Sequence, residues 1–146
     1  MGLLSQLRDK RVYLDTNVFI YLLEGTSEYQ SVMKEVLRGL EEVAFEAHTS
    51  TLTLTEILPP LVRSGDEGLL SSTIEFIRDS GSFRLIDIDD EVGIQAGFLR
   101  GETKMKTPDA LHVACAVEAH CDVFLTNDAG IRVPQGMTRL LVSEFL

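Results

Sequence analysis

A chain of 146 residues has the length of one domain and can bury a hydrophobic core, so we expect a single domain over residues 1–146. Apolar residues make up 45% of the chain and charged residues 25%. No apolar run reaches the roughly 18 residues of a membrane span, which predicts a soluble protein without a membrane partner. The formal net charge of −10 argues against broad, nonspecific binding of nucleic acid, yet it is compatible with a cation site built from carboxylates.

The first half of the chain contains short apolar stretches separated by helical patterns. They predict a strand over 11–15, helices over 16–24 and 28–46, and a strand over 47–50. Residues 51–65 leave two interpretations open, because the alternation in TLTLT favours a strand, whereas Glu56–Val62 before Gly65 favours a helix. Pro59-Pro60 indicates a kink or a boundary, since proline is poorly tolerated inside both kinds of element.

The second half alternates helices and strands more regularly. We expect strands over 83–88, 122–126 and 138–142, helices over 67–79, 89–100 and 107–119, and a loop or short helix over 127–136. This alternation predicts an α/β domain with a mainly parallel sheet. Cys115 and Cys121 lie in or beside an apolar helix, so we expect reduced thiols in a cytoplasmic protein.

The helix expected over 107–119 is apolar on most of its surface and should therefore be buried. Asp109 nevertheless stands in its first turn. A local explanation exists: Thr107 caps the helix, Pro108 takes the first helical position, and Asp109 lies in the positive field of the helix start. That explanation accounts for a single acid in this place.

Three other acids follow predicted strands closely. Asp15 ends the first strand, Asp128 follows the strand over 122–126 by two residues, and Glu56 comes shortly after another strand. Because the carboxyl ends of parallel strands meet at one edge of a sheet, we expect these acids and Asp109 to converge there. Carboxylates that converge repel one another unless a cation lies between them.

Four motifs, VYLDTNVFIYLL, TLTLTEIL, TPDALHVACAV and VFLTND, occur in this order and together resemble the PIN domain family, from about Arg11 to Val142. The similarity is to VapC-type ribonuclease toxins. It implies a Rossmann-like three-layer fold with a parallel five-stranded sheet in the order 3-2-1-4-5. It also implies Mg²⁺ or Mn²⁺ bound by an acidic quartet, which by motif is Asp15, Glu56, Asp109 and Asp128, with Asn17 and Thr126 holding these ligands in place.

The resemblance implies that the protein is an endoribonuclease and the toxin of a type II toxin–antitoxin pair. A metal-activated water would cleave RNA and leave a 3′-hydroxyl and a 5′-phosphate. The implied partners are an antitoxin, which would insert an Arg or Lys into the acidic site, and a second copy in a homodimer. Lys104, Lys106 and Arg132 flank the motifs and are candidates for phosphate contacts, although solvated surface charge is the simpler explanation.

Other interpretations remain open. The chain is alternatively a PIN fold kept only as a binding scaffold. A phosphoacceptor signalling domain needs adjacent acids early in the chain, whereas Leu14 precedes Asp15, and a haloacid-dehalogenase-type phosphatase needs Asp-x-Asp, where this chain has Asn17. His112 follows Asp109 by one helical turn, and its pattern leaves both a structural and a catalytic role possible.

Overall fold

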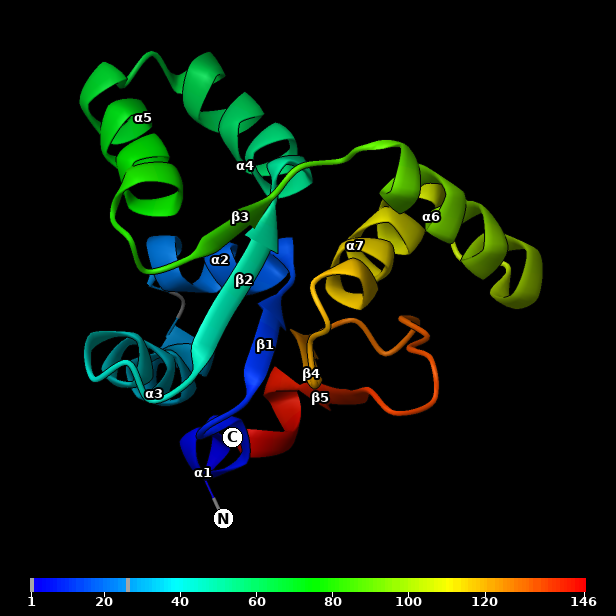
Figure 1. Ribbon diagram of the computed structural model, residues 1–146. Coiled ribbons are helices and arrows are strands. Elements are labelled where there is room, and N and C mark those ends of the chain that lie inside the picture. The colour runs from blue at the N-terminus through cyan, green and yellow to red at the C-terminus, as the bar shows by residue number, and fades with distance from the viewer. Residues whose placement is uncertain (1, 26) are drawn as a thin grey trace.

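The computed structural model describes residues 2–25 and 27–146. Its five strands form one parallel sheet in the order β3-β2-β1-β4-β5 (Figure 1), which confirms the order implied by the resemblance. Each pair of neighbours is parallel, and Tyr13 in β1 lies between His48 in β2 and Phe124 in β4. The strands are β1 (Arg11–Leu14), β2 (Glu46–Ser50), β3 (Arg84–Ile86), β4 (Val123–Thr126) and β5 (Thr138–Leu141).

Helices cover both faces of this sheet (Figure 1), giving three layers with a hydrophobic core on each side. One core contains the apolar residues of α1 (Leu3–Leu7), α2 (Thr16–Glu24), α3 (Gln30–Glu41) and α4 (Thr51–Ser64). The other lies beneath α6 (Asp90–Thr103) and α7 (Thr107–Glu118). None of the helices in the described part of the chain combines the length and the apolar character needed to cross a bilayer.

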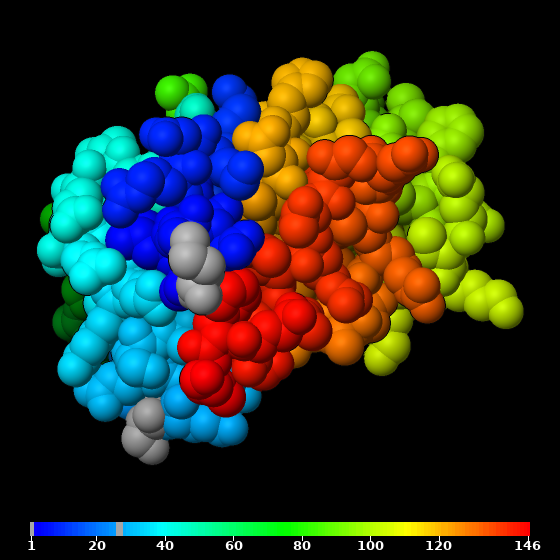
Figure 2. Space-filling model, turned by 90° about the horizontal axis from the view of Figure 1, so that it is seen from below, coloured from blue at the N-terminus to red at the C-terminus, as the bar shows by residue number. Residues whose placement is uncertain are grey.

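The two ends of the chain pack against each other. Leu3, Leu4 and Leu7 of α1 are buried in the same core as Val142, which opens the short 3₁₀ helix η3 (Val142–Phe145). Figure 2 shows this contact as red C-terminal atoms beside the blue N-terminal ones. Helix α1 was not expected from the sequence, because five residues are too few for a helical period to be recognised.

Helix α3 differs from its prediction at both ends. A 3₁₀ turn, η1 (Ser27–Tyr29), precedes it, and it ends at Glu41 rather than 46. The stop is a Schellman motif in which the Ala44 amide donates to the Gly39 carbonyl at 2.8 Å and the Val43 amide to the Leu40 carbonyl at 3.3 Å. Val43 has φ 51°, where glycine is usual, so no glycine marks the end of this helix in the sequence.

Residues 51–64 form one continuous helix, α4, so the boundary expected at Pro59-Pro60 is wrong. The two prolines lack the amides that would bond to the carbonyls of Thr55 and Glu56, and both of those residues are exposed to water. After Gly65, α5 (Glu67–Ile74) continues directly into a π-helical turn, η2 (Glu75–Asp79). The helix predicted over 67–79 is therefore present, whereas the strand predicted over 83–88 is shorter.

Candidate functional site

The four predicted acids come together where β1, β2 and β4 end. Asp15 directly follows β1, Glu56 stands in the second turn of α4 after β2, and Asp128 lies two residues beyond β4. Asp109 occupies the first turn of α7. Burial raises the pKa of Asp109 most, and then the charges of Asp128, Asp15 and Glu56 raise it further, while His112 lowers it. Asp128, Asp15 and Glu56 are therefore close enough to Asp109 for their charges to disfavour its ionised form.

Asp15 is the most buried acid of the site, and the start of α2 holds it. The Thr16 amide donates to its Oδ1 at 2.9 Å, and the Thr126 hydroxyl donates to its Oδ2 at 2.7 Å. Burial is the main reason why the pKa of Asp15 is raised; His112 and these two hydrogen bonds act in the opposite direction. Burial thus disfavours the charged form of Asp15, and a cation nearby would favour it.

A short hydrogen-bond chain connects Asn17 to Asp15. The Asn17 side-chain amide donates to Thr126 Oγ1 at 3.1 Å, and the Thr126 hydroxyl in turn donates a hydrogen bond to Asp15. The Asp128 amide also donates to Thr126 Oγ1, at 3.1 Å, so the same hydroxyl fixes the start of the loop after β4. The structure brings Asn17 and Thr126 to the acids, while their part in binding a metal stays a prediction.

Glu56 is held by two residues. Its Oε1 accepts a hydrogen bond from the Thr16 hydroxyl at 2.7 Å and lies 2.5 Å from Nε2 of His112. The hydrogen bond with His112 is the main reason why the pKa of Glu56 is lowered, against the raising effect of burial. Thr16 was not expected in the site, although it stands between Asp15 and Asn17. For His112, the signal in the sequence was its position one helical turn after Asp109, which left a role in the site possible.

The helix start at Asp109 differs from the local explanation. Lys106, in extended conformation, is the N-cap residue of α7 and makes no side-chain cap bond, while Thr107 is already helical. The prediction that Thr107 caps this helix is therefore wrong. Among the described residues no hydrogen bond is made by the Asp109 carboxylate, which is only partly buried. Without a cap bond, the field of the helix start is the local explanation that remains for Asp109, and the neighbouring acids act against it.

Three exposed cations surround the loops beside the site. Lys104 ends α6 with φ 66°, Lys106 precedes α7, and Arg132 lies in the loop after β4. The two loops touch, because the Arg132 amide contacts Sδ of Met105 at 3.4 Å. Within the described ranges 2–25 and 27–146 none of these cations forms an ion pair. Their contact with phosphate stays a prediction.

The donor set fits a hard divalent cation, because it consists of carboxylate oxygens, the ligands that such ions prefer. The arrangement is not a preformed cage. No three His, Cys, Asp or Glu side chains among the described residues lie close enough together to hold a metal ion in this structure. A cation at this edge would therefore have to draw the carboxylates inwards against their mutual repulsion.

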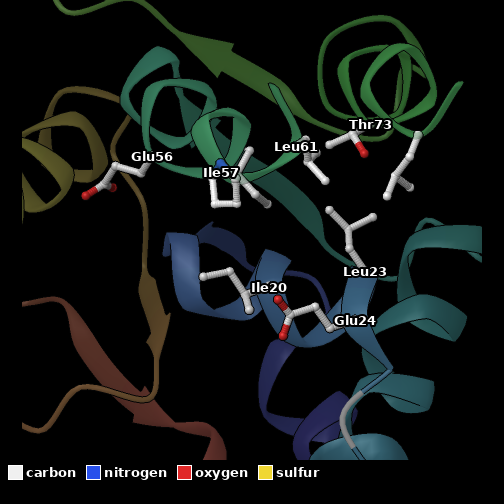
Figure 3. Close-up of a pocket in the computed structure, with 9 residues that line it drawn as sticks. Ile20, Leu23, Glu24, Glu56, Ile57, Leu61 and Thr73 are labelled. Carbon is white, nitrogen blue, oxygen red and sulfur yellow. The ribbon is translucent and has the colours of Figure 1, made fainter. Parts of the chain in front are cut away.

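An apolar pocket begins beside the acidic site. It lies between α2, α4 and α5, and Ile20, Leu23, Ile57 and Leu61 line it. Figure 3 shows these side chains between the helices, with Glu56 at one end and its carboxylate directed away from the pocket. An apolar surface thus adjoins the four carboxylates, which is the chemistry that a segment with apolar and basic side chains would recognise.

Solved structures share this fold. The chain is similar to DNA-bound VapBC from Salmonella typhimurium, with a TM-score of 0.70, 20% identity, and coverage of 91% of this chain and 98% of that chain. It is also similar to VapBC2 from Rickettsia felis bound to a promoter DNA fragment, with a TM-score of 0.69, 15% identity, and coverage of 90% of this chain and 98% of that chain. For VapC20 of Mycobacterium tuberculosis, a toxin that cleaves the sarcin–ricin loop, the TM-score is 0.61 and the identity 17%, with coverage of 77% of this chain and 86% of that chain.

Sequence comparison leads to the same group of proteins. No curated protein sequence matches the chain. The profile of the PIN domain, however, matches residues 12–135, which include all four acids. Because this match spans most of the chain and the parallel sheet has the expected order, the chain belongs to the PIN domain family.

Proposed function

We propose that the protein is a Mg²⁺- or Mn²⁺-dependent endoribonuclease and the toxin of a type II toxin–antitoxin pair. The observation that carries the proposal is the convergence of four carboxylates from separate segments, where burial first and then the charges of the other three acids raise the pKa of Asp109. Membership of the PIN family and the likeness of the fold to VapC structures support it. The sarcin–ricin loop activity belongs to VapC20, and here it supports RNA as the substrate class.

Asp15, Glu56, Asp109 and Asp128 would hold the cation. When bound, a divalent cation lowers the pKa of a water molecule and offsets the negative charge of the phosphate. The chain's own residues orient the ligands: Thr126 fixes Asp15 through Oδ2. The carboxylates repel RNA when no cation is present, so RNA affinity should depend on the divalent ion and on the exposed cations beside the site.

One observation favours the alternative of a binding scaffold without catalysis. The acids of the described residues do not form a metal-binding cluster as they stand. A scaffold would bind its partner without divalent ions and would leave RNA intact. Cleavage and metal binding therefore distinguish the two proposals.

The decisive experiment incubates the purified protein with a pool of structured RNAs in Mn²⁺, in Mg²⁺ and in EDTA. We expect cleavage with either ion, none in EDTA, and products carrying a 3′-hydroxyl and a 5′-phosphate. Glu42→Gln serves as the control for the loss of one negative charge. Glu42 is exposed where α3 ends, before β2 begins, and so it lies away from the site at the carboxyl ends of the strands. Intact RNA together with no Mn²⁺ binding by calorimetry would leave only the scaffold.

The antitoxin is part of the same proposal. Solved structural neighbours include VapBC and a toxin–antitoxin complex from Klebsiella pneumoniae. The apolar pocket beside Glu56 and the net charge of −10 are complementary to a segment with apolar side chains and an Arg or Lys. Leu23→Asp should weaken antitoxin binding and leave RNA cleavage by the free protein unchanged. Unchanged antitoxin affinity in that variant would remove the pocket from the proposal.

The homodimer is also a proposal, and the outer face of α6 supports it. Phe98 is 64% exposed there, and a Cβ atom added at Gly93, Gly97 or Gly101 would meet no neighbouring atom. Two copies of α6 packed antiparallel about Gly97 would place Asp90 of one copy opposite Lys104 of the other, which are opposite charges. Phe98→Glu should then turn a dimer into a monomer in light scattering, and an unchanged mass would exclude this face.

A further inference from the structure

His112 connects the acidic site to the hydrophobic core. It lies on α7 with 1% of its surface exposed, and both of its ring nitrogens have polar neighbours. Such a position differs from that of a histidine that merely fills space. The residues around the two nitrogens indicate what the ring does.

Nε2 of His112 faces the acids. It lies 2.5 Å from Oε1 of Glu56, 3.2 Å from Oγ1 of Thr16 and 3.6 Å from Oδ1 of Asp15. The closest of these atoms belongs to a carboxylate, which only accepts hydrogen bonds. A proton on Nε2 therefore donates to Glu56, and the ring stands between two of the proposed metal ligands.

Nδ1 of His112 faces the core. It lies 2.7 Å from the hydroxyl of Tyr13, a fully buried residue of β1, and that hydroxyl lies 2.8 Å from Oγ of Ser50 at the end of β2. The central strands of the sheet thus fix the orientation of the imidazole. The ring cannot turn without losing a buried hydrogen bond.

Glu56 is the least buried of the residues in this chain of contacts, and α4 alone would leave its side chain free to rotate. Its Oε1 is occupied by Thr16 and His112, while no residue in the described part of the chain donates a hydrogen bond to Oε2. One carboxylate oxygen is therefore held by the protein and the other remains available.

We propose that His112 is a positioning residue that, oriented by Tyr13, holds Oε1 of Glu56 and leaves Oε2 for a divalent cation. The identity of the cation rests on the proposed function, whereas the hydrogen bond between His112 and Glu56 is independent of it. Groups that orient metal ligands in this way typically change metal affinity about 10- to 100-fold when they are removed. A histidine that only packs in the core would change stability and leave affinity unchanged.

The chain offers a matched control in His48. This residue lies on β2 and is 2% exposed, and in residues 2–25 and 27–146 neither ring nitrogen has a hydrogen-bond partner, the nearest carboxylate being that of Glu46 at 3.6 Å. It is thus a buried histidine of the same type without contact to the four acids. His48→Leu should leave the affinity for Mn²⁺ unchanged, whatever it does to stability.

The experiment measures Mn²⁺ affinity by calorimetry and thermal stability for three replacements of His112. Leucine removes the donor, and asparagine can reach Tyr13 but is too short to reach Glu56. Glutamine carries an N–H near the position of Nε2. We expect affinity to fall about 10- to 100-fold in His112→Leu and His112→Asn and to return within a few-fold of wild type in His112→Gln.

Each result decides between the two roles. Wild-type affinity in a folded His112→Leu overturns the proposal, as does an equal loss in His112→Leu and His112→Gln at similar stability. If the wild type itself binds no Mn²⁺, the proposed function fails, and ¹⁵N spectra of the metal-free protein still test the hydrogen bond. A protonated Nε2 on His112 that loses its exchange protection in Glu56→Ala supports the positioning role, whereas an unprotonated Nε2 refutes it.

Discussion

Asp109→Asn should change the stability of the protein in opposite directions with and without a divalent cation. In the metal-free protein the carboxylate is partly buried beside Asp128, Asp15 and Glu56, and burial and these charges raise its pKa. Asparagine keeps the size of the side chain and removes the charge. We expect the variant to be more stable by roughly 0.5 kcal/mol in EDTA, a value discounted for solvent screening because Asp109 is not fully buried.

With Mn²⁺ the order should reverse. At an ion concentration about 100 times the Kd, binding stabilises the wild type by about 2.7 kcal/mol. If loss of one ligand weakens binding about 100-fold, the same concentration stabilises the variant by only about 0.4 kcal/mol. The wild type should then exceed the variant by roughly 2 kcal/mol, a difference several times larger than that in EDTA.

The advantage of the variant in EDTA should also depend on pH. Because the folded-state pKa of Asp109 is raised, folding favours its protonated form, and the wild type loses stability as the pH rises through this pKa. Below the unfolded-state pKa of about 3.9 both states are protonated, so the difference between wild type and Asp109→Asn should disappear. The difference is fully developed once the pH exceeds the folded-state pKa of Asp109.

Urea denaturation in EDTA and in Mn²⁺, at neutral pH and below about pH 3.9, measures all three effects. Glu42→Gln is again the control for net charge. A variant that is less stable than the wild type in EDTA would refute the repulsion among the carboxylates and restore the helix start as the reason for Asp109. An equal stabilisation of both proteins by Mn²⁺ would refute its role as a ligand.

Three further predictions concern separate features. Val43→Gly should raise the free energy of unfolding by roughly 1 kcal/mol in urea denaturation, because Val43 is 80% exposed and holds φ 51°; a loss of stability would contradict the strain. Thr126→Val should lower it by about 1–3 kcal/mol, since the buried Asp15 loses a hydrogen bond of 2.7 Å, and unchanged stability would mean that water replaces the hydroxyl. Lys106→Ala should slow RNA cleavage and spare Mn²⁺ affinity in calorimetry, and normal cleavage across a range of salt would exclude its contact with phosphate.

The sheet could be predicted from the sequence because each central strand is a short buried run, such as VYL or VFL, between helical patterns. The order of the strands came from the resemblance to a family. The ends of the helices were harder to predict from the sequence. The stop of α3 depends on Val43 in a conformation that valine rarely adopts, and α4 continues through Pro59-Pro60, against the usual preference. Local propensity fails where the surrounding fold imposes a conformation.

The place of Asp15, Glu56 and Asp128 could also be predicted, because a position shortly after a strand is a local property of the sequence. Asp109 follows α6 instead, and its place came from the resemblance to a family. What holds each acid is a different matter. Thr16 and His112 contact Glu56 across 40 and 56 residues, and Tyr13 contacts His112 across 99. Contacts of this kind exist only once the strands are in register.

His112 illustrates the limit most clearly. In the sequence it is one polar residue within the apolar stretch ALHVACAV, whereas His48 stands among polar residues in EAHTS. Both histidines are buried to nearly the same extent, yet one bridges Tyr13 and Glu56 and the other has no hydrogen-bond partner among the described residues. Burial and residue type are therefore insufficient to assign a role. The two side chains differ because the carboxyl edge of the sheet carries the acids, and only α7 brings a histidine to that edge.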